Sequence, residues 1–412
     1  MSHLTSLATA LLAGALMTDT THAEQPTLGL QFAGALEFAD DGTLFVGDNY
    51  RGAVYAFEIP AEASTTEIQP SSVLNIDTRI AELLGVGVGA IEINDIATHP
   101  ISDDIYISVT RIGNFASQPA IVTVSPDNRL QLLDMSALTF TKQELNAFPD
   151  AQTTFTVRGA RRVGILPRDQ AKGSVAVRSL AIMDMEFYDG ELFVAGVAHD
   201  DFQSSLRRIA YPFEGSQSLA SVDMYHIVHD QYESRAPIRA MSVQQVDGKA
   251  QLVAAYTCSP VVLIPLEDIE DGAQISASTI MDMGNGQPLD MVPFQMGDEP
   301  MLFVTNHSRS PRVIPVAGLS GARVVTDEDF ERGPKLDMHP VMPFGPVGKH
   351  VMFDGVSLHI ARLGDSHFAS VTRDAYTGTL NLDINPTFFP NRMHNFFAES
   401  DIPASNNAEP RR

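Results

Sequence analysis

The chain alternates short apolar runs with tight polar turns, and this pattern repeats along most of its length. The clearest unit is GALEFADDGTLFVGDNYRGAVYAFEI at 34–59, in which three apolar runs are separated by a polar turn and a polar loop. The DDG turn favours a hairpin because Asp and Gly tolerate positive φ. Short apolar runs bounded by turn residues are typical of β-strands, so each unit predicts a small antiparallel sheet.

Five more units repeat this order at 95–114, 183–201, 239–266, 289–316 and 349–374. A further strand-like run follows most units, at 72–76, 129–135, 221–227, 275–283 and 379–384. Four-stranded antiparallel units that recur about every 50 to 60 residues are typical of β-propeller blades. The pattern therefore predicts an all-β fold, a single β-propeller of four-stranded antiparallel blades, with six blades favoured.

One segment, 136–177, interrupts the repeat. It contains SALTFTKQELNAFPDAQ, which is helical or irregular by its pattern, and TTFTVRGARRVGIL, which fits a strand. The segment is either a large insertion or a decayed extra blade, so seven blades is the alternative. Because no stretch has the composition of an inter-domain linker, we predict one propeller domain over 24–403.

The two ends of the chain have compositions of their own. The apolar run LATALLAGALM at 7–17 has the length of a signal peptide, and Thr21 and Ala23 fit a cleavage site before Glu24. This predicts a signal peptide over 1–23 and a periplasmic or secreted protein. An apolar N-terminal strand or helix is the alternative. The polar tail at 404–412 is predicted to be disordered.

Composition and charge narrow the range of partners. The chain has one cysteine, so it forms no internal disulfide and its core must provide the stability. A net charge of −24 argues against binding to nucleic acid or to anionic membrane surfaces. The apolar run at 7–17 is too short to span a membrane, and no other stretch is long enough. We expect a monomer whose partners are a small molecule or a periplasmic protein.

Propeller geometry gathers the loops between second and third strands at one rim of the predicted molecule. Five side chains with metal-binding chemistry fall on the rim loops and crossovers of three consecutive units: His199, His226, His229, Cys258 and His307. Imidazole and thiolate ligands suit zinc or copper. However, His226 and His229 are three residues apart, and this spacing puts two side chains on opposite sides of a strand. Surface histidines beside a buried structural thiol are the alternative interpretation.

The first strands carry a second candidate set, because the first strand of each blade lines the central channel. These strands begin near Asn94, Asp95, Asp184, Arg239 and Asp290. Carboxylate and amide oxygens suit Ca²⁺ or a similar cation, which would activate a water for hydrolysis. On these strands the candidate metal ligands are Asn94, Asp95 and Asp290. A channel of mutually paired charges is the alternative.

Two further residues are predicted to contact a bound ligand. Arg239 lies in a first strand, and Asn306 lies in a rim loop. In the alternative interpretation of the channel, Arg239 instead balances the charge of an aspartate.

Sequence motifs exclude several reactions. No G-x-S-x-G motif is present, and the absence of C-x-x-C-H excludes covalently attached haem. GVGVGA at 85–90 matches a dinucleotide-binding motif loosely, but a strand-like run follows it where that motif needs a helix. We expect a structural role for Cys258, and a thiolate–imidazole pair with a rim histidine is the alternative.

Three stretches, at 193–215, 226–265 and 266–294, resemble a group of uncharacterised secreted bacterial β-propeller proteins. This resemblance covers about 175–320, and the whole chain is broadly similar to SMP-30, quinoprotein and YncE-type propellers. In SMP-30-type lactonases a Glu, two Asn and an Asp surround a divalent cation. The resemblance assigns such roles to Glu37, Asn94 and Asp290, but this sequence has no second Asn at a matching position.

Two functions follow from these patterns. The first is an exported scaffold whose rim binds a small ligand, a metal or a periplasmic redox partner. The alternative is a metal-dependent hydrolase, lactonase-like, or an oxidoreductase that uses the rim His/Cys set or the channel carboxylates. Copper, zinc and calcium are the divalent metals that the two ligand sets suit.

Overall fold

The computed structural model describes most of the predicted propeller domain. The described residues are 28–112, 117–156, 174–200, 203–227, 229–257, 260–283, 287–307, 311–328, 349–350, 356–374 and 376–387. The predicted signal peptide, Cys258 and the predicted tail lie outside the described residues.

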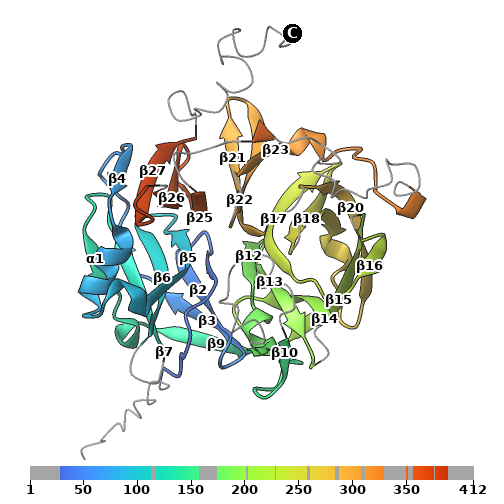
Figure 1. The fold of residues 1–412 in the computed structure, drawn as a ribbon, viewed down its shortest axis with the longest axis horizontal. Coiled ribbons are helices and arrows are strands. Elements are labelled where there is room, and N and C mark those ends of the chain that lie inside the picture. The colour runs from blue at the N-terminus through green and yellow to red at the C-terminus, as the bar shows by residue number, and fades with distance from the viewer. Residues whose placement is uncertain are drawn as a thin grey trace, which may run out of the picture.

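The fold is all-β, a propeller-like arrangement of small antiparallel sheets (Figure 1). Four separate sheets have four strands each. The first contains β1 (Leu36–Phe38), β2 (Thr43–Asp48), β3 (Ala53–Glu58) and β9 (Phe140–Glu144). The second contains β5 (Ile91–Thr98), β6 (Ile105–Ile112), β7 (Ser117–Val124) and β8 (Leu130–Leu132). The third contains β21 (Pro288–Met296), β22 (Glu299–Asn306), β23 (Arg312–Pro315) and β24 (Lys349–His350). The fourth contains β25 (Val356–Leu363), β26 (His367–Arg373), β27 (Leu380–Pro386) and β4 (Ser71–Val73).

A larger, nine-stranded sheet fills the remaining part of the ring. Its first half contains β12 (Asp184–Tyr188), β13 (Glu191–Ala198), β14 (Gln203–Ala210) and β15 (Gln217–His226). Its second half contains β17 (Ile238–Val246), β18 (Lys249–Tyr256), β19 (Pro260–Pro265) and β20 (Gln274–Asp282). The outer strands β15 and β20 pair in parallel, and β16 (Gln231–Glu233) pairs with β15. The six blades predicted from the sequence therefore match the sheets only if this sheet counts as two blades.

The first strands of these units form the wall of a central channel. In the described part of the chain, β1 contacts β12, β12 contacts β17, β17 contacts β21, β21 contacts β25, β25 contacts β5, and β5 contacts β1. The ring closes, but its order differs from the order of the sequence: the sheet of β5 lies between the last sheet and the first (Figure 1).

Two outer strands, β4 and β9, join sheets other than those formed by the strands next to them in the sequence. After β3 the chain adds β4 to the last sheet, where Val73 pairs with Leu382, and then forms helix α1 (Ile76–Leu83). After β8 it returns to the first sheet, where β9 pairs with β3. The prediction that 136–152 is helical or irregular was wrong for β9, because edge pairing with β3 provides it with a strand partner.

Short elements complete the described structure. The strands β10 (Thr154–Thr156) and β11 (Ser174–Ala176) form a two-stranded sheet. The 3₁₀-helices are η1 (Val88–Ala90), η2 (Met135–Ala137), η3 (Val177–Leu180), η4 (Leu266–Asp268) and η5 (Val316–Gly318). None of the described helices combines the length and the apolar character needed to cross a bilayer.

The core lies between neighbouring sheets, and large side chains of the second strands fill it. Phe45, Phe193 and Phe303, one from each of three second strands, are fully buried. Burying an aromatic side chain removes a large apolar surface from water, which stabilises the face-to-face packing of the sheets. The polar side chains of the first strands are thereby left to face the channel.

Candidate functional site

A cavity of about 470 Å³ lies in the central channel, and residues of all six first strands line it. Seven of the lining residues carry carboxyl groups, and five of them lie on first strands: Glu37, Asp95, Asp184, Glu186 and Asp290. They come from β1, β5, β12 and β21, where side chains alternate between the two faces of a strand. The closed ring thus brings carboxylates from first strands that are far apart in the sequence into one cavity, and this makes the cavity acidic.

Each of these carboxylates also joins two neighbouring first strands. One oxygen accepts a hydrogen bond from a backbone N–H of the adjacent first strand, at 2.6–3.0 Å. The pairs are Leu36 N with Asp95, Phe187 N with Glu37, Met241 N with Asp184, Val243 N with Glu186, and Ile360 N with Asp290. The carboxylates thus hold the channel wall together, and the second oxygens of Asp95 and Asp184 also accept from the backbone N–H groups of Ile96 and Met185.

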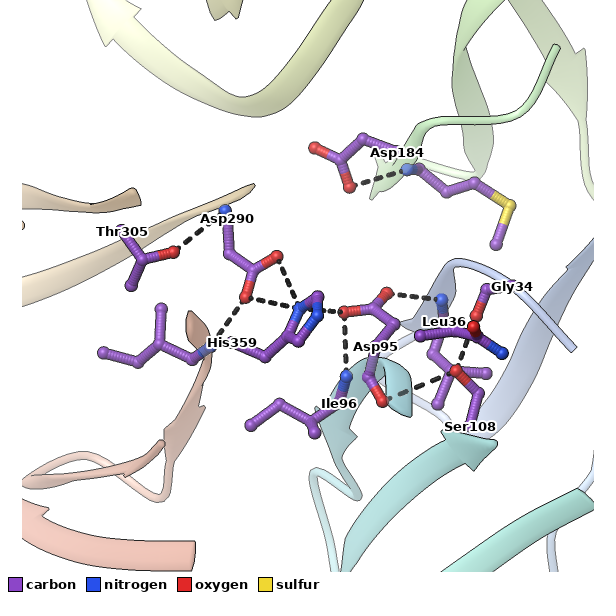
Figure 2. A network of polar contacts seen from close by, with 12 residues as sticks. Gly34, Leu36, Asp95, Ile96, Ser108, Asp184, Asp290, Thr305 and His359 are labelled. Carbon is purple, nitrogen blue, oxygen red and sulfur yellow. Dashed lines mark hydrogen bonds and ion pairs between the residues drawn. The ribbon is translucent and has the colours of Figure 1, made fainter. Parts of the chain in front are cut away.

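His359, on β25, lies between two of these carboxylates (Figure 2). Its Nδ1 is 3.2 Å from Oδ2 of Asp290 and 3.6 Å from Oδ1 of Asp95. One ligand atom from each of the three residues lies within 4.8 Å of the other two. Two carboxylates and one imidazole that converge in this way have the chemistry of a metal site.

Burial and mutual repulsion disturb the ionisation of this group. Burial, followed by the charge of Asp290, raises the pKa of Asp95 to about 7. Burial alone would lower the pKa of His359, but the charge and hydrogen bond of Asp290 and the charge of Asp95 outweigh it, so the pKa is raised. The imidazole is therefore stabilised in its charged form, as a positive group between two acids.

The other carboxyl groups of the cavity are shifted in the same direction. Burial and the charge of Glu186 raise the pKa of Glu37, and burial and the charge of Asp95 raise the pKa of Asp184. Burial raises the pKa of Glu186 to about 7 although Val243 N and Ser242 donate hydrogen bonds to it. Carboxylates that repel one another in a buried cavity favour the binding of a cation.

The structure separates the members of the predicted channel set. Glu37, Asp95 and Asp290 line the cavity, whereas the amide of Asn94 donates to Ala33 O and Thr110 Oγ1, both at 2.8 Å. Asn94 therefore acts within the wall. Arg239 lies close enough to Asp290 and Asp184 for their charges to act on its pKa, which burial lowers.

Two channel residues escaped the sequence analysis. Glu186 is two positions after Asp184, on the same face of β12, and this period of two is the signal that would have found it. His359 lies within the apolar run VSLHIARL, and its position in a first strand was the available signal.

The structure brings together only part of the predicted rim set. His226 and His229 lie side by side with Glu233, whereas the exposed His199 and His307 join neither metal-binding group found among the described residues. Cys258 lies outside the described residues. Asn306 ends β22 and is largely buried.

Fold and cavity together define a propeller-like protein with an acidic central channel. No family model matches the chain, and no curated protein matches its sequence. Its fold is similar to an engineered GH43 glycoside hydrolase with endo-xylanase and exo-arabinofuranosidase activity, at 10% identity and a TM-score of 0.34 over 77% of this chain and 52% of that one. The chain spans about half of that hydrolase.

Two other solved structures are similar along nearly their whole length. The β-propeller domain of Cps50 (Swd1) from Myceliophteria thermophila is 10% identical, with a TM-score of 0.33 over 86% of this chain and 95% of that one. A glucose dehydrogenase is 12% identical, with a TM-score of 0.32 over 86% of this chain and 96% of that one. Likenesses of this size carry no argument about the reaction.

Proposed function

We propose that this chain is a six-bladed propeller whose central cavity binds one divalent cation through Asp95, Asp290 and His359. The single observation that carries the proposal is the convergence of these three side chains, with ligand atoms within 4.8 Å of one another, two of which belong to residues that line the cavity, Asp95 and Asp290. They come from three different first strands, so the closed ring itself positions them.

Charge supports the binding of a cation. Seven carboxyl groups line the cavity, against the basic side chains of Arg362 and His99 in its lining and of His359 and Arg239 beside its carboxylates. A divalent ion would lower the repulsion that raises the pKa of Asp95, and it would displace the proton of His359. Because the donor set includes an imidazole nitrogen, we favour Mn²⁺ or Zn²⁺ over Ca²⁺, which prefers oxygen ligands alone.

The size of the cavity favours a second candidate function, metal-assisted hydrolysis of a small polar molecule. A space of about 470 Å³ is within the range of small-molecule sites and leaves coordination positions of a bound metal open. Glu186, with a pKa of about 7, has the proton affinity expected of a general base at neutral pH. A metal held by Asp95, Asp290 and His359 would supply an acidified water, and Glu186 would accept its proton.

A metal-binding measurement tests the proposal directly. The purified chain is stripped with EDTA, and Mn²⁺ binding is measured by equilibrium dialysis. We expect about one equivalent bound to the wild type and a loss of at least tenfold in affinity in Asp290→Asn. This variant keeps an oxygen that accepts from Ile360 N. Asp247→Asn, in the exposed turn after β17, is the matched control. Equal binding by all three proteins contradicts the proposal.

We also propose that the mature chain begins at Glu24 and acts outside the cytoplasm as a monomer. The support is the apolar run at 7–17 with its small residues before Glu24. The mass of the protein recovered from a periplasmic extract tests this, because an uncleaved N-terminus would contradict it.

A further inference from the structure

A second group of potential metal ligands lies at the outer edge of the ring, away from the first strands. It consists of His226, His229 and Glu233, whose ligand atoms all lie within 4.8 Å of one another. His226 ends β15, the outer strand of its half-sheet, and Glu233 ends the short strand β16 beside it. This group shares no residue with the channel site.

The hairpin between β15 and β16 holds these three side chains together. Residues 226 and 231 are paired, and residues 224 and 233 are paired, so Glu233 lies on the strand next to His226. In the turn, His229 N donates to His226 O at 3.1 Å, and Tyr225 Oη donates to Asp230 Oδ1 at 2.7 Å. The spacing of three is thus compatible with a shared site, because His226 is the last residue of its strand and His229 lies in the turn.

The geometry of the ring nitrogens fits a metal site. His226 Nδ1 is 3.2 Å from Glu233 Oε1, close to the separation of about 3.3 Å between two ligands of a tetrahedral zinc ion. His229 Nδ1 contacts the same carboxylate oxygen, and the two imidazole rings lie 4.4 Å apart at their centroids. The ligand atoms of all three residues therefore lie close together, within 4.8 Å of one another.

A second, independent observation concerns the burial of His226. Its side chain is 2% exposed, and neither ring nitrogen makes a hydrogen bond of good geometry within the described residues. Its Nε2 lies 3.7 Å from Oδ2 of Asp282, the buried last residue of β20. A carboxylate behind a histidine is the usual arrangement that orients a metal-binding imidazole.

We propose that His226, His229 and Glu233 form a binding site for a divalent metal of the Zn²⁺ class, with Asp282 as a positioning residue for His226. Two imidazoles and one carboxylate are a ligand set that zinc takes in proteins. The half-exposed side chain of His229, at 48%, leaves the fourth coordination position open to water or to a small ligand.

The experiment isolates this site by removing the channel site first. In the full-length Asp290→Asn protein, stripped of metal, Zn²⁺ binding is measured by titration calorimetry and Co²⁺ binding by visible absorption. We expect about one equivalent of Zn²⁺ and the intense absorption of tetrahedral Co²⁺. Adding His229→Gln removes both, whereas adding His307→Gln, which replaces an exposed histidine elsewhere on the rim, changes neither.

Two results overturn the proposal. One is the absence of Zn²⁺ binding in Asp290→Asn, and the other is unchanged binding after His229→Gln. Adding Asp282→Asn tests the positioning role: we expect Zn²⁺ affinity to fall about 10- to 100-fold while the stoichiometry and the Co²⁺ spectrum remain. Unchanged affinity would refute this role. Because His229 is half-exposed in a turn, its replacement leaves the core intact, which near-ultraviolet circular dichroism verifies.

Discussion

Replacing Glu186 by Gln removes one buried negative charge from the channel while keeping its hydrogen bonds. The side-chain oxygen of Gln accepts from Val243 N, as Oε1 of Glu186 does at 2.8 Å, and from Ser242 Oγ, at 3.3 Å in the present structure. The shape of the side chain is also preserved. The substitution therefore tests the electrostatics of the cavity with little change in packing.

The magnitude of the effect follows from the pKa of Glu186. Burial raises it from an ordinary value of 4.5 to about 7, which corresponds to about 3 kcal/mol between the two protonation states. Because the folded-state pKa is raised, the contribution of this carboxyl to stability is fully present below pH 4.5 and is lost as the pH rises through 7. Above pH 8 the wild type thus carries a penalty that Glu186→Gln does not.

Urea denaturation at pH 5 and pH 8, with EDTA present, measures the difference. We expect Glu186→Gln to gain about 2–3 kcal/mol of unfolding free energy relative to the wild type at pH 8, and less than about 1 kcal/mol at pH 5. Relief of the repulsion with Glu37 adds to this gain. Glu58→Gln, at an exposed position on β3, is the matched control and should show no such difference. A gain that is equal at both pH values would refute the electrostatic reasoning.

Four further substitutions test packing and the role of Asn94. Gly196→Ala would place a methyl group against the carbonyl of Ala181, so urea denaturation should show a loss of about 2–4 kcal/mol in the free energy of unfolding. Gly248→Ala is the control: this turn position has a φ of 76° and open space around it, so the variant should lose only about 1 kcal/mol. Phe303→Ala should lose about 3–5 kcal/mol in the same assay, because this side chain is fully buried, and a loss below 1 kcal/mol would contradict the assigned core. Asn94→Ala should lose about 1–2 kcal/mol and still bind Mn²⁺ like the wild type in equilibrium dialysis, since its amide binds only the wall in the described structure; weakened Mn²⁺ binding would make it a ligand.

The fold was largely predictable because its strands have a local signal. Apolar runs such as 43–48 and turn residues such as Asp189 and Gly190, both at positive φ, mark strands and hairpins in the sequence itself. Local patterns do not tell which sheet an outer strand joins. Long-range pairing decides that β4 joins the sheet of β27 and that β9 joins the sheet of β3. Long-range contacts also place the sheet of β5 between the sheets of β25 and β1.

The candidate sites were predictable only in part, because they too depend on residues that are far apart in the sequence. Carboxylates on first strands, such as Glu37 and Asp290, could be assigned to a channel once the repeat was recognised. His359 could not, because a histidine within an apolar strand has no local feature that distinguishes a ligand from a core residue. The approach of His226 to His229 depends on where β15 ends, and strand ends are the least predictable feature of a sequence.

The central claim is that the channel binds a divalent cation between Asp95, Asp290 and His359. A crystal of the full chain grown with Mn²⁺, measured at a wavelength where manganese scatters anomalously, tests it most directly. We predict an anomalous peak about 2.0–2.3 Å from a carboxylate oxygen of each aspartate and from Nδ1 of His359. A channel without such a peak, with His359 still hydrogen-bonded to Asp290, would contradict the account.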